Sequence, residues 1–190
     1  MRIAVIGPQN TGKSTYIKDF LKAFPQYSTP EETYRDIVEE KRLVINQKTN
    51  EDSQREIRNF MYTQFRHTVD KNIIFDRSLI DNYVYTYAQY VEGAITKSFL
   101  EETEAMMKEM LHSVDIYFFI PASLSVALVS DGTRDITRKY IDTINGCFLK
   151  ILFELSREYA INVKIISGDR KERIKKPLNR FLTILIFRKR

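Results

Sequence analysis

The sequence predicts an α/β fold with a five-stranded, mostly parallel, doubly wound sheet and helices on both faces. Three observations support this prediction. Short apolar segments alternate with segments of helical periodicity, and a glycine-bracketed turn directly follows the first apolar segment. The chain has 190 residues, 43% of them hydrophobic, which suffices for one sizeable core. No repeat or Gly/Ser linker divides it, so we expect a single domain over residues 1–190.

Each element follows from its local pattern. Short apolar runs bounded by Gly, Pro or polar residues are the expected strands: Arg2–Ile6, Gln26–Thr29, Asn72–Phe75, Asp115–Ile120 and Asn162–Ile166. Hydrophobic residues at helical spacing predict the helices: Thr15–Phe24, Thr33–Arg42, Thr49–Lys71, Leu79–Val91, Phe99–Leu111 and Arg138–Tyr159. Because parallel strands end at one edge of a sheet, ligands of such folds bind at that edge.

Composition limits the class of protein. The single cysteine, Cys147, excludes an internal disulfide and fits a reducing, cytoplasmic location. No apolar run approaches the roughly 18 residues of a membrane span. The first residues lack the pattern of a signal peptide, so we expect a cytoplasmic protein without a membrane segment.

The charge is unevenly distributed. The chain carries a net charge of +5, and residues 170–190 hold nine Lys or Arg and one acid, Glu172. A basic surplus favours partners that bear phosphate, including nucleotides and nucleic acid. Two interpretations of this basic tail stay open: a solvated terminal helix, or a contact with nucleic acid or with another subunit of an oligomer.

The turn after the first strand carries the most specific motif. Its sequence is Gly7-Pro-Gln-Asn10-Thr11-Gly12-Lys13-Ser14, which matches G-x-x-x-x-G-K-[ST]. Its glycines let the backbone curl so that amide groups face phosphate oxygens, and the following helix adds its positive end. We expect Lys13 to reach the β- and γ-phosphates of ATP, Ser14 to ligate Mg²⁺, and Thr15 to touch the α-phosphate or simply to begin the helix.

A second group of polar residues follows the expected strand Asn72–Phe75. Asp76 and Arg77 would lie at the same sheet edge as the phosphate loop. Asp76 could then hold Mg²⁺ directly or through water, and Arg77 could bind the acceptor or the transferring phosphoryl group. The alternative is that Asp76 or Ser78 only caps the next helix.

Two further groups have both a catalytic and a structural interpretation. Glu31 or Glu32 could accept the proton of an attacking hydroxyl, although Glu32 and Arg35 also have the spacing of a helical ion pair. The segment Asp131–Arg134, with Arg138 beyond it, predicts a lid at about residues 129–140 whose arginines close over the phosphoryl group. A surface turn before the last long helix is the alternative.

The order of these motifs resembles the P-loop kinases of the nucleoside and nucleotide kinase group. It is most similar to the branch with the nicotinamide riboside kinase domain and many phage-encoded ATP-binding kinases. The resemblance rests on matching segments across nearly the whole chain: Gly7–Thr15, Glu32-x-x-Arg35, Phe75–Ser78, Asp131–Arg134 and Ile165–Gly168. It implies a P-loop NTPase fold with a lid.

The resemblance also implies roles for single residues. The base would be Glu32, with Glu31 as the alternative, and the Asp-Arg pair would be Asp76 and Arg77. The lid arginines would be Arg134 and Arg138, and the adenine would contact Gly168 and Asp169. Three features depart from the family pattern: the second expected strand is short and polar, residues 43–53 contain no recognisable acceptor motif, and the basic tail is not typical of the family.

Together these features predict an ATP-dependent phosphotransferase that uses Mg²⁺ and a nucleoside, nucleotide or nucleoside-like acceptor. One alternative is a kinase that acts on a DNA or RNA end or on a modified base in DNA. Another is a regulatory ATPase without an acceptor. The chain lacks the base-reading Asn-Lys-x-Asp element of GTPases, which argues against a GTPase-like switch.

Overall fold

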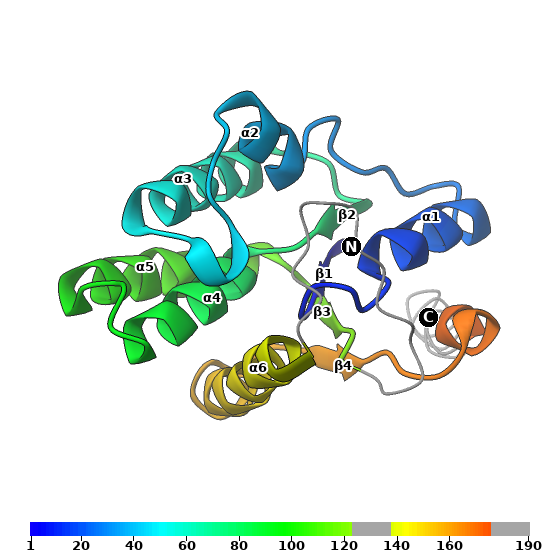
Figure 1. The fold of residues 1–190 in the computed structure, drawn as a ribbon. Coiled ribbons are helices and arrows are strands. Elements are labelled where there is room, and N and C mark those ends of the chain that lie inside the picture. The colour runs from blue at the N-terminus through cyan, green and yellow to red at the C-terminus, as the bar shows by residue number, and fades with distance from the viewer. Residues whose placement is uncertain (123–137, 176–190) are drawn as a thin grey trace.

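A parallel sheet forms the centre of the molecule. The computed structural model describes residues 1–122 and 138–175 (Figure 1). Within this part of the chain the sheet has four strands in the order β2-β1-β3-β4. They are β1 Arg2–Ile6, β2 Ile73–Asp76, β3 Ile116–Phe119 and β4 Val163–Ile165. All neighbouring pairs are parallel, so their carboxyl ends share one edge.

The helices follow the predicted periodicity closely. Their bounds are α1 Lys13–Ala23, α2 Tyr34–Glu40, α3 Glu51–His67, α4 Leu79–Val91, α5 Lys97–Met110 and α6 Arg138–Tyr159, with short 3₁₀ turns η1 Asn46–Lys48 and η2 Leu111–Ser113. Two helices begin with reciprocal capping boxes, formed by Thr33 with Asp36 and by Ser78 with Asp81. The predicted helix over residues 49–71 ends earlier, at His67.

The prediction of a second strand at Gln26–Thr29 is wrong. Of Gln26–Thr29, only Ser28 pairs with the sheet, in an isolated parallel bridge to Ile73. Ile74 donates its N–H to the Ser28 carbonyl at 2.9 Å, and Ser28 donates to the Asn72 carbonyl at 3.0 Å. The segment lies between Pro25 and Pro30, which have no N–H to continue a ladder. In the described residues, four strands and one bridge therefore replace the five predicted strands.

Helices cover both faces of the sheet, as predicted. On one face α1 packs its buried side chains Tyr16, Ile17 and Phe20 against alternate residues of the strands. On the other face α2 to α6 surround a larger core. Figure 1 shows this division, with α1 on one side of the strands and α3, α4, α5 and α6 on the other. No helix in the described part of the chain is both long and apolar enough to cross a membrane.

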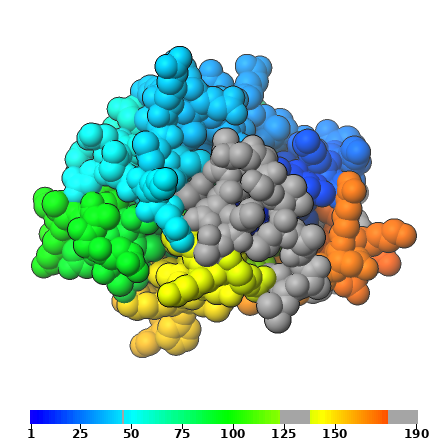
Figure 2. Space-filling view, in the orientation of Figure 1, coloured from blue at the N-terminus to red at the C-terminus, as the bar shows by residue number. Residues whose placement is uncertain are grey.

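The described start of the basic tail lies against α1. Residues 170–175 are helical, and the guanidinium of Arg170 binds Asp19 of α1 through two hydrogen bonds of 2.6 and 2.7 Å. Figure 2 shows this segment, in orange, on the same side of the molecule as α1. Residues 176–190 of the predicted tail and 129–137 of the predicted lid, including Arg134, lie outside the described residues.

Candidate active site

The phosphate loop has the curled backbone that its sequence predicts. Gly12 and Asn10 adopt left-handed conformations, with φ of 84° and 60°. Gly7 has φ of 139°, and a Cβ atom there would lie 2.3 Å from the carbonyl oxygen of Ile120. Only glycine fits this close approach to the end of β3. The loop is therefore compact, and it turns directly from β1 into α1.

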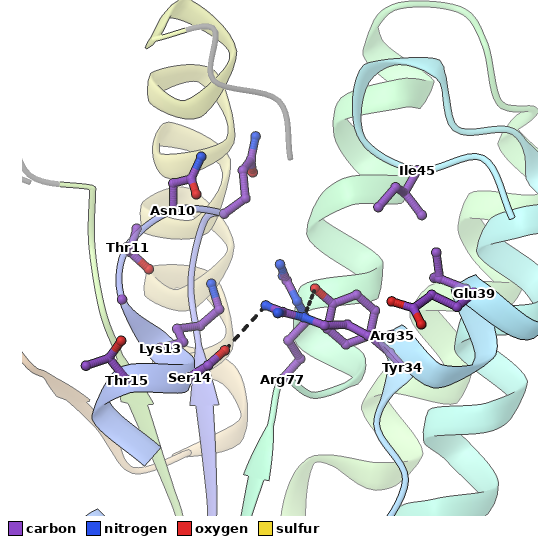
Figure 3. A pocket seen from close by; sticks show the side chains of 13 residues that line it. Asn10, Thr11, Lys13, Ser14, Thr15, Tyr34, Arg35, Glu39, Ile45 and Arg77 are labelled. Carbon is purple, nitrogen blue, oxygen red and sulfur yellow. Dashed lines mark hydrogen bonds between the residues drawn. The ribbon is translucent and has the colours of Figure 1, made fainter. Parts of the chain in front are cut away.

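The amino end of α1 faces the larger of two adjoining cavities. Gly12, the N-cap of α1, provides no side-chain hydrogen bond to the helix. A cavity of about 350 Å³ lies at this end, lined on the loop side by Gln9, Asn10, Thr11, Gly12, Lys13, Ser14 and Thr15. Figure 3 shows the loop residues Asn10, Thr11, Lys13 and Ser14 on one side of the cavity and Tyr34, Arg35, Glu39 and Ile45 on the other. Unsatisfied amides at a helix N-terminus make such a cavity suited to a phosphate group.

Lys13 lies inside the loop. Its side chain is buried, and its ammonium group donates hydrogen bonds to the carbonyls of Gly7, at 2.8 Å, and Pro8. Burial lowers the pKa of Lys13 well below its usual range, and the charge of Arg77 lowers it further, against the opposing charges of Asp81 and Asp76. An anion in the cavity would favour the charged form of this lysine.

Helix α4 supports the loop from behind through Asp81. The Asp81 carboxylate is 1% exposed and accepts hydrogen bonds from the Gly7 N–H at 3.2 Å, the Ser78 N–H at 2.9 Å and the Arg77 guanidinium at 3.2 Å. Asp81 was not among the predicted site residues. The spacing Ser78-x-x-Asp81 is the signal of a capping box, but it does not reveal the contact with Gly7.

Ser14 and Asp76 lie together next to the cavity. The Ser14 hydroxyl donates to Asp76 Oδ2 at 3.3 Å and accepts from Arg35 Nη2 at 3.3 Å. The other carboxylate oxygen, Asp76 Oδ1, is buried without a hydrogen-bond partner among the described residues. A hydroxyl beside an unpaired carboxylate oxygen fits the oxygen ligands that Mg²⁺ prefers. The described residues hold no cluster of three or more His, Cys, Asp or Glu.

Arg77 stands between the two cavities. It has φ of 78°, a conformation that costs about 1 kcal/mol or more for a non-glycine residue and that clusters at functional sites. Its guanidinium lies 4.8 Å from the ring centroid of Tyr34 and 5.3 Å from that of Tyr85. Because it lines both cavities, Arg77 is placed to touch whatever bridges them.

The second cavity extends between α2, α3 and α4. It has a volume of about 50 Å³ and shares Tyr34, Ile45 and Arg77 with the first cavity. Its remaining lining comes from α3 and α4: Gln54, Ile57, Met61, Asp81, Asn82 and Tyr85. Gln54 and Asn82 were not predicted from the sequence, because a single polar residue within a helix carries no motif.

The predicted acids after the second strand lie away from both cavities. Glu31 and Glu32 are exposed, and neither belongs to the lining of these two cavities. The Glu32 carbonyl accepts a hydrogen bond of 2.7 Å from Gln64 of α3. The carboxylate of this region that does line the larger cavity is Glu39, one turn after Arg35. The role of Glu32 as a base stays a prediction.

The remaining predicted residues lie at the margins of the site. Arg138 begins α6 and donates to Asp142 at 3.0 Å, outside the cavity lining. Gly168 and Asp169 also lie outside it, but Arg173 connects their segment to the phosphate loop. Its guanidinium donates to the carbonyls of Gly168 at 2.9 Å and Thr11 at 2.8 Å.

This geometry defines a class of protein. A parallel sheet whose first strand runs through a curled G-x-x-x-x-G-K-S loop into a helix is the P-loop NTPase fold. The family model described as "AAA domain" matches residues 2–173, and the chain belongs to this family. A comparison with curated protein sequences found no significant match.

Solved structures of kinases share the fold. The chain is similar to deoxyadenosine kinase from M. mycoides, with a TM-score of 0.72, 19% identity and coverage of 97% of this chain and 100% of that one. It is also similar to thymidylate kinase from Candida albicans, with a TM-score of 0.65, 16% identity and coverage of 96% and 90%. The NadR protein in complex with NR gives a TM-score of 0.63, 18% identity and coverage of 88% of this chain and 46% of NadR.

Proposed function

We propose that the chain is an ATP- and Mg²⁺-dependent kinase that transfers the γ-phosphoryl group to a nucleoside, nucleotide or nucleoside-like acceptor. One observation carries the proposal: Lys13, Arg35 and Arg77 converge on the cavity at the amino end of α1, beside the Ser14–Asp76 pair. Three cations, a helix terminus and a candidate Mg²⁺ site suit a triphosphate, whose transfer requires mainly positioning and charge stabilisation.

The residues divide the work between donor and acceptor. The amides of the loop and the Lys13 ammonium bind the β- and γ-phosphates, while Ser14 and Asp76 hold Mg²⁺, which neutralises charge on the phosphate oxygens. Arg77 lies where the second cavity opens into the first, so it contacts the reacting hydroxyl or the phosphoryl group in transfer. Arg35, bonded to Ser14, stabilises the same charge from the α2 side.

The similar structures support a nucleoside or nucleotide as the acceptor. They are a deoxyadenosine kinase with the products dCMP and dCDP bound, a thymidylate kinase, and NadR in complex with NR. Each acts on or binds a nucleoside or nucleotide. The second cavity, with its aromatic, apolar and amide lining, offers a place for the non-reacting part of such an acceptor.

A labelled-phosphate transfer screen tests the proposal. ATP labelled at the γ position is offered with nucleosides, nucleoside monophosphates, nicotinamide riboside and oligonucleotides, with Mg²⁺ or with EDTA. We expect a phosphorylated nucleoside or nucleotide that forms only with Mg²⁺. Label on oligonucleotides would instead support the kinase of DNA or RNA, and free phosphate without a phosphorylated acceptor would support the regulatory ATPase.

Substitution of the loop lysine gives the matched control. Lys13→Ala removes the cation from the phosphate cavity, and we expect turnover to fall by about 10³-fold or more while the fold stays intact. Lys22→Ala, an exposed substitution in the last turn of α1, should leave turnover unchanged. Near-normal activity of the folded Lys13→Ala protein would contradict the proposal.

A further inference from the structure

Gln9 of the phosphate loop has a buried amide side chain. The motif G-x-x-x-x-G-K-[ST] accepts any residue at this position, so the fold of the loop does not require an amide there. The side chain is 4% exposed and lines the larger cavity. Gln9 directly follows Pro8, whose carbonyl accepts a hydrogen bond from the Lys13 ammonium group. Gln9 therefore belongs to the part of the loop that surrounds this cation.

Tyr85 of α4 fixes the orientation of the Gln9 amide. The Tyr85 hydroxyl accepts a hydrogen bond of 3.1 Å from the Gln9 backbone N–H and donates one of 2.5 Å to Gln9 Oε1. The shorter distance fits an O–H···O bond, because N–H···O bonds are usually about 2.9 Å long. Burial raises the pKa of Tyr85, so its hydroxyl keeps the proton that it donates. The amide oxygen therefore faces Tyr85, and the NH₂ group is the other end of the amide.

The NH₂ group at that end lacks a partner. Gln9 Nε2 is buried and makes no hydrogen bond within the described parts of the chain. A buried donor without a partner costs free energy, so its presence in the wall of a cavity indicates that a ligand supplies an acceptor. Lys13, Arg35 and Arg77 line the same cavity, so the acceptor that this cavity favours is an anionic oxygen.

The bond between Gln9 and Tyr85 also places the amide where the two cavities adjoin. Gln9 lines the larger cavity, Tyr85 lines the second, and Arg77 lines both. In the proposed function the phosphates of ATP occupy the larger cavity and the non-reacting part of the acceptor occupies the second. The amide therefore lies where the γ-phosphoryl group passes from donor to acceptor.

We propose that Gln9 is a catalytic residue whose Nε2 donates a hydrogen bond to an oxygen of the γ-phosphoryl group in transfer, with Tyr85 as its positioning residue. In this role, which rests on the proposed kinase function, Gln9 keeps both amide protons and stabilises charge. The acceptor oxygen forms a bond to the γ-phosphorus while the bond from that phosphorus to the β,γ-bridging oxygen breaks. ADP leaves with the electron pair, and a hydroxyl acceptor gives its proton to a base or to solvent.

Gln9→Met tests the donor, because it has a similar volume and no N–H group. We expect kcat to fall by about 30-fold, as for the loss of one hydrogen bond to a charged group. The KM for ATP should change by less than about 3-fold, because the loop amides and Lys13 still bind the phosphates. Gln26→Met makes the same change at an exposed amide outside both cavities and should match the wild type. An unchanged kcat in folded Gln9→Met protein overturns the inference.

Binding measurements separate a catalytic role from a structural one. ADP with aluminium fluoride mimics the phosphoryl group in transfer, and calorimetry compares its affinity with that of ATP. Gln9→Met should weaken binding of the mimic by about 30-fold and leave the affinity for ATP nearly unchanged. Equal weakening of both ligands would mean that Gln9 only maintains the loop.

Tyr85→Phe tests the positioning role. It keeps the ring beside Arg77 and removes only the hydroxyl, so kcat should fall by about 5-fold. Because Tyr85 acts through Gln9, the double variant Gln9→Met/Tyr85→Phe should lose no more than Gln9→Met alone. Losses that multiply would overturn this role of Tyr85.

Transfer is measured both to the acceptor and to water, which distinguishes failure of this inference from failure of the proposed function. A phosphorylated acceptor with an unchanged kcat in Gln9→Met overturns only the role of Gln9. Release of phosphate to water that falls in Gln9→Met, without any phosphorylated acceptor, supports Gln9 and overturns the acceptor function alone. No transfer to either overturns both.

Discussion

The two sides of the larger cavity differ in how many of their residues are buried and hydrogen-bonded to the rest of the fold. The loop wall, residues 9–15, is held from behind: Gln9, Thr11 and Lys13 are buried, and the loop is bonded to α4 through Asp81 and Tyr85. The α2 wall consists of Tyr34, Arg35, Val38 and Glu39 of α2, together with Ile45. Val38 is the one buried side chain among the seven residues of α2, and the other residues of this wall are partly buried or exposed.

This difference indicates that the loop wall serves phosphoryl transfer and that the α2 wall serves recognition of the acceptor. A preorganised wall suits the triphosphate, because oriented amides and cations stabilise phosphoryl transfer without rearrangement. A wall with fewer buried contacts has lower local stability and can move when an acceptor binds. We therefore expect substitutions at or behind the loop wall to reduce turnover. Substitutions in the α2 wall should mainly change the KM for the acceptor.

After the loop lysine, the next largest effect is expected at Asp76, the proposed metal ligand. Asp76→Asn removes one negative charge beside Ser14, so Mg²⁺ should bind more weakly and turnover at saturating ATP should fall by about 10²-fold. Turnover is measured as a function of Mg²⁺ concentration. Asp70→Asn, an exposed change just before β2, is the control. An unchanged Mg²⁺ dependence in folded Asp76→Asn protein would remove Asp76 from the metal site.

The loop wall is also the side that the sequence predicted well. Gly7, Gly12, Lys13 and Ser14 belong to one short motif between a strand and a helix, so local chemistry determines their arrangement. The position of Asp76 followed from a general property of parallel sheets, whose strands end at one edge. The Ser14 hydroxyl lies 3.3 Å from Asp76 Oδ2, as expected for two residues at the same edge of the sheet.

The α2 wall and the second cavity depend on contacts that sequence spacing does not contain. Glu32 and Glu39 are both acids near α2, and only the path of the chain after Ser28 decides that Glu39 lines the cavity. Gln54 and Asn82 meet through the packing of α3 against α4. Arg173 reaches the loop across 162 residues. Tertiary packing thus decides where these side chains meet.

A smaller effect is expected in the α2 wall. Tyr34 packs its ring on Arg77 and accepts a hydrogen bond of 3.3 Å from Arg35 Nε. Tyr34→Leu removes both interactions and should raise the KM for the acceptor about 10-fold, with a smaller change in the KM for ATP. Tyr34→Phe keeps the ring and loses only the hydrogen bond, so its KM should be closer to that of the wild type. A larger change in the KM for ATP than for the acceptor would contradict the division between the two walls.

The smallest expected effect is a proton taken up when ATP binds to the loop wall. Burial lowers the pKa of Lys13 in the free protein, and the charge of a triphosphate would raise it again. Between the lowered and the raised pKa, binding therefore adds a proton to Lys13, and the affinity for ATP falls as the pH rises through this window. Calorimetry at about pH 8.5, in two buffers of different ionisation enthalpy, measures this uptake as a fraction of one proton.

Lys13→Arg separates this proton from any other. A guanidinium stays charged throughout the window, so the variant should bind ATP with less proton uptake than the wild type. The difference between the two proteins belongs to the residue at position 13, because uptake by other groups is common to both. Equal uptake would mean that Lys13 is already charged beside the Gly7 and Pro8 carbonyls. The loop wall would then carry its full positive charge before the nucleotide binds, held by these two carbonyls. The loop wall would in that case be even more preorganised, relative to the α2 wall, than the burial of Lys13 implies.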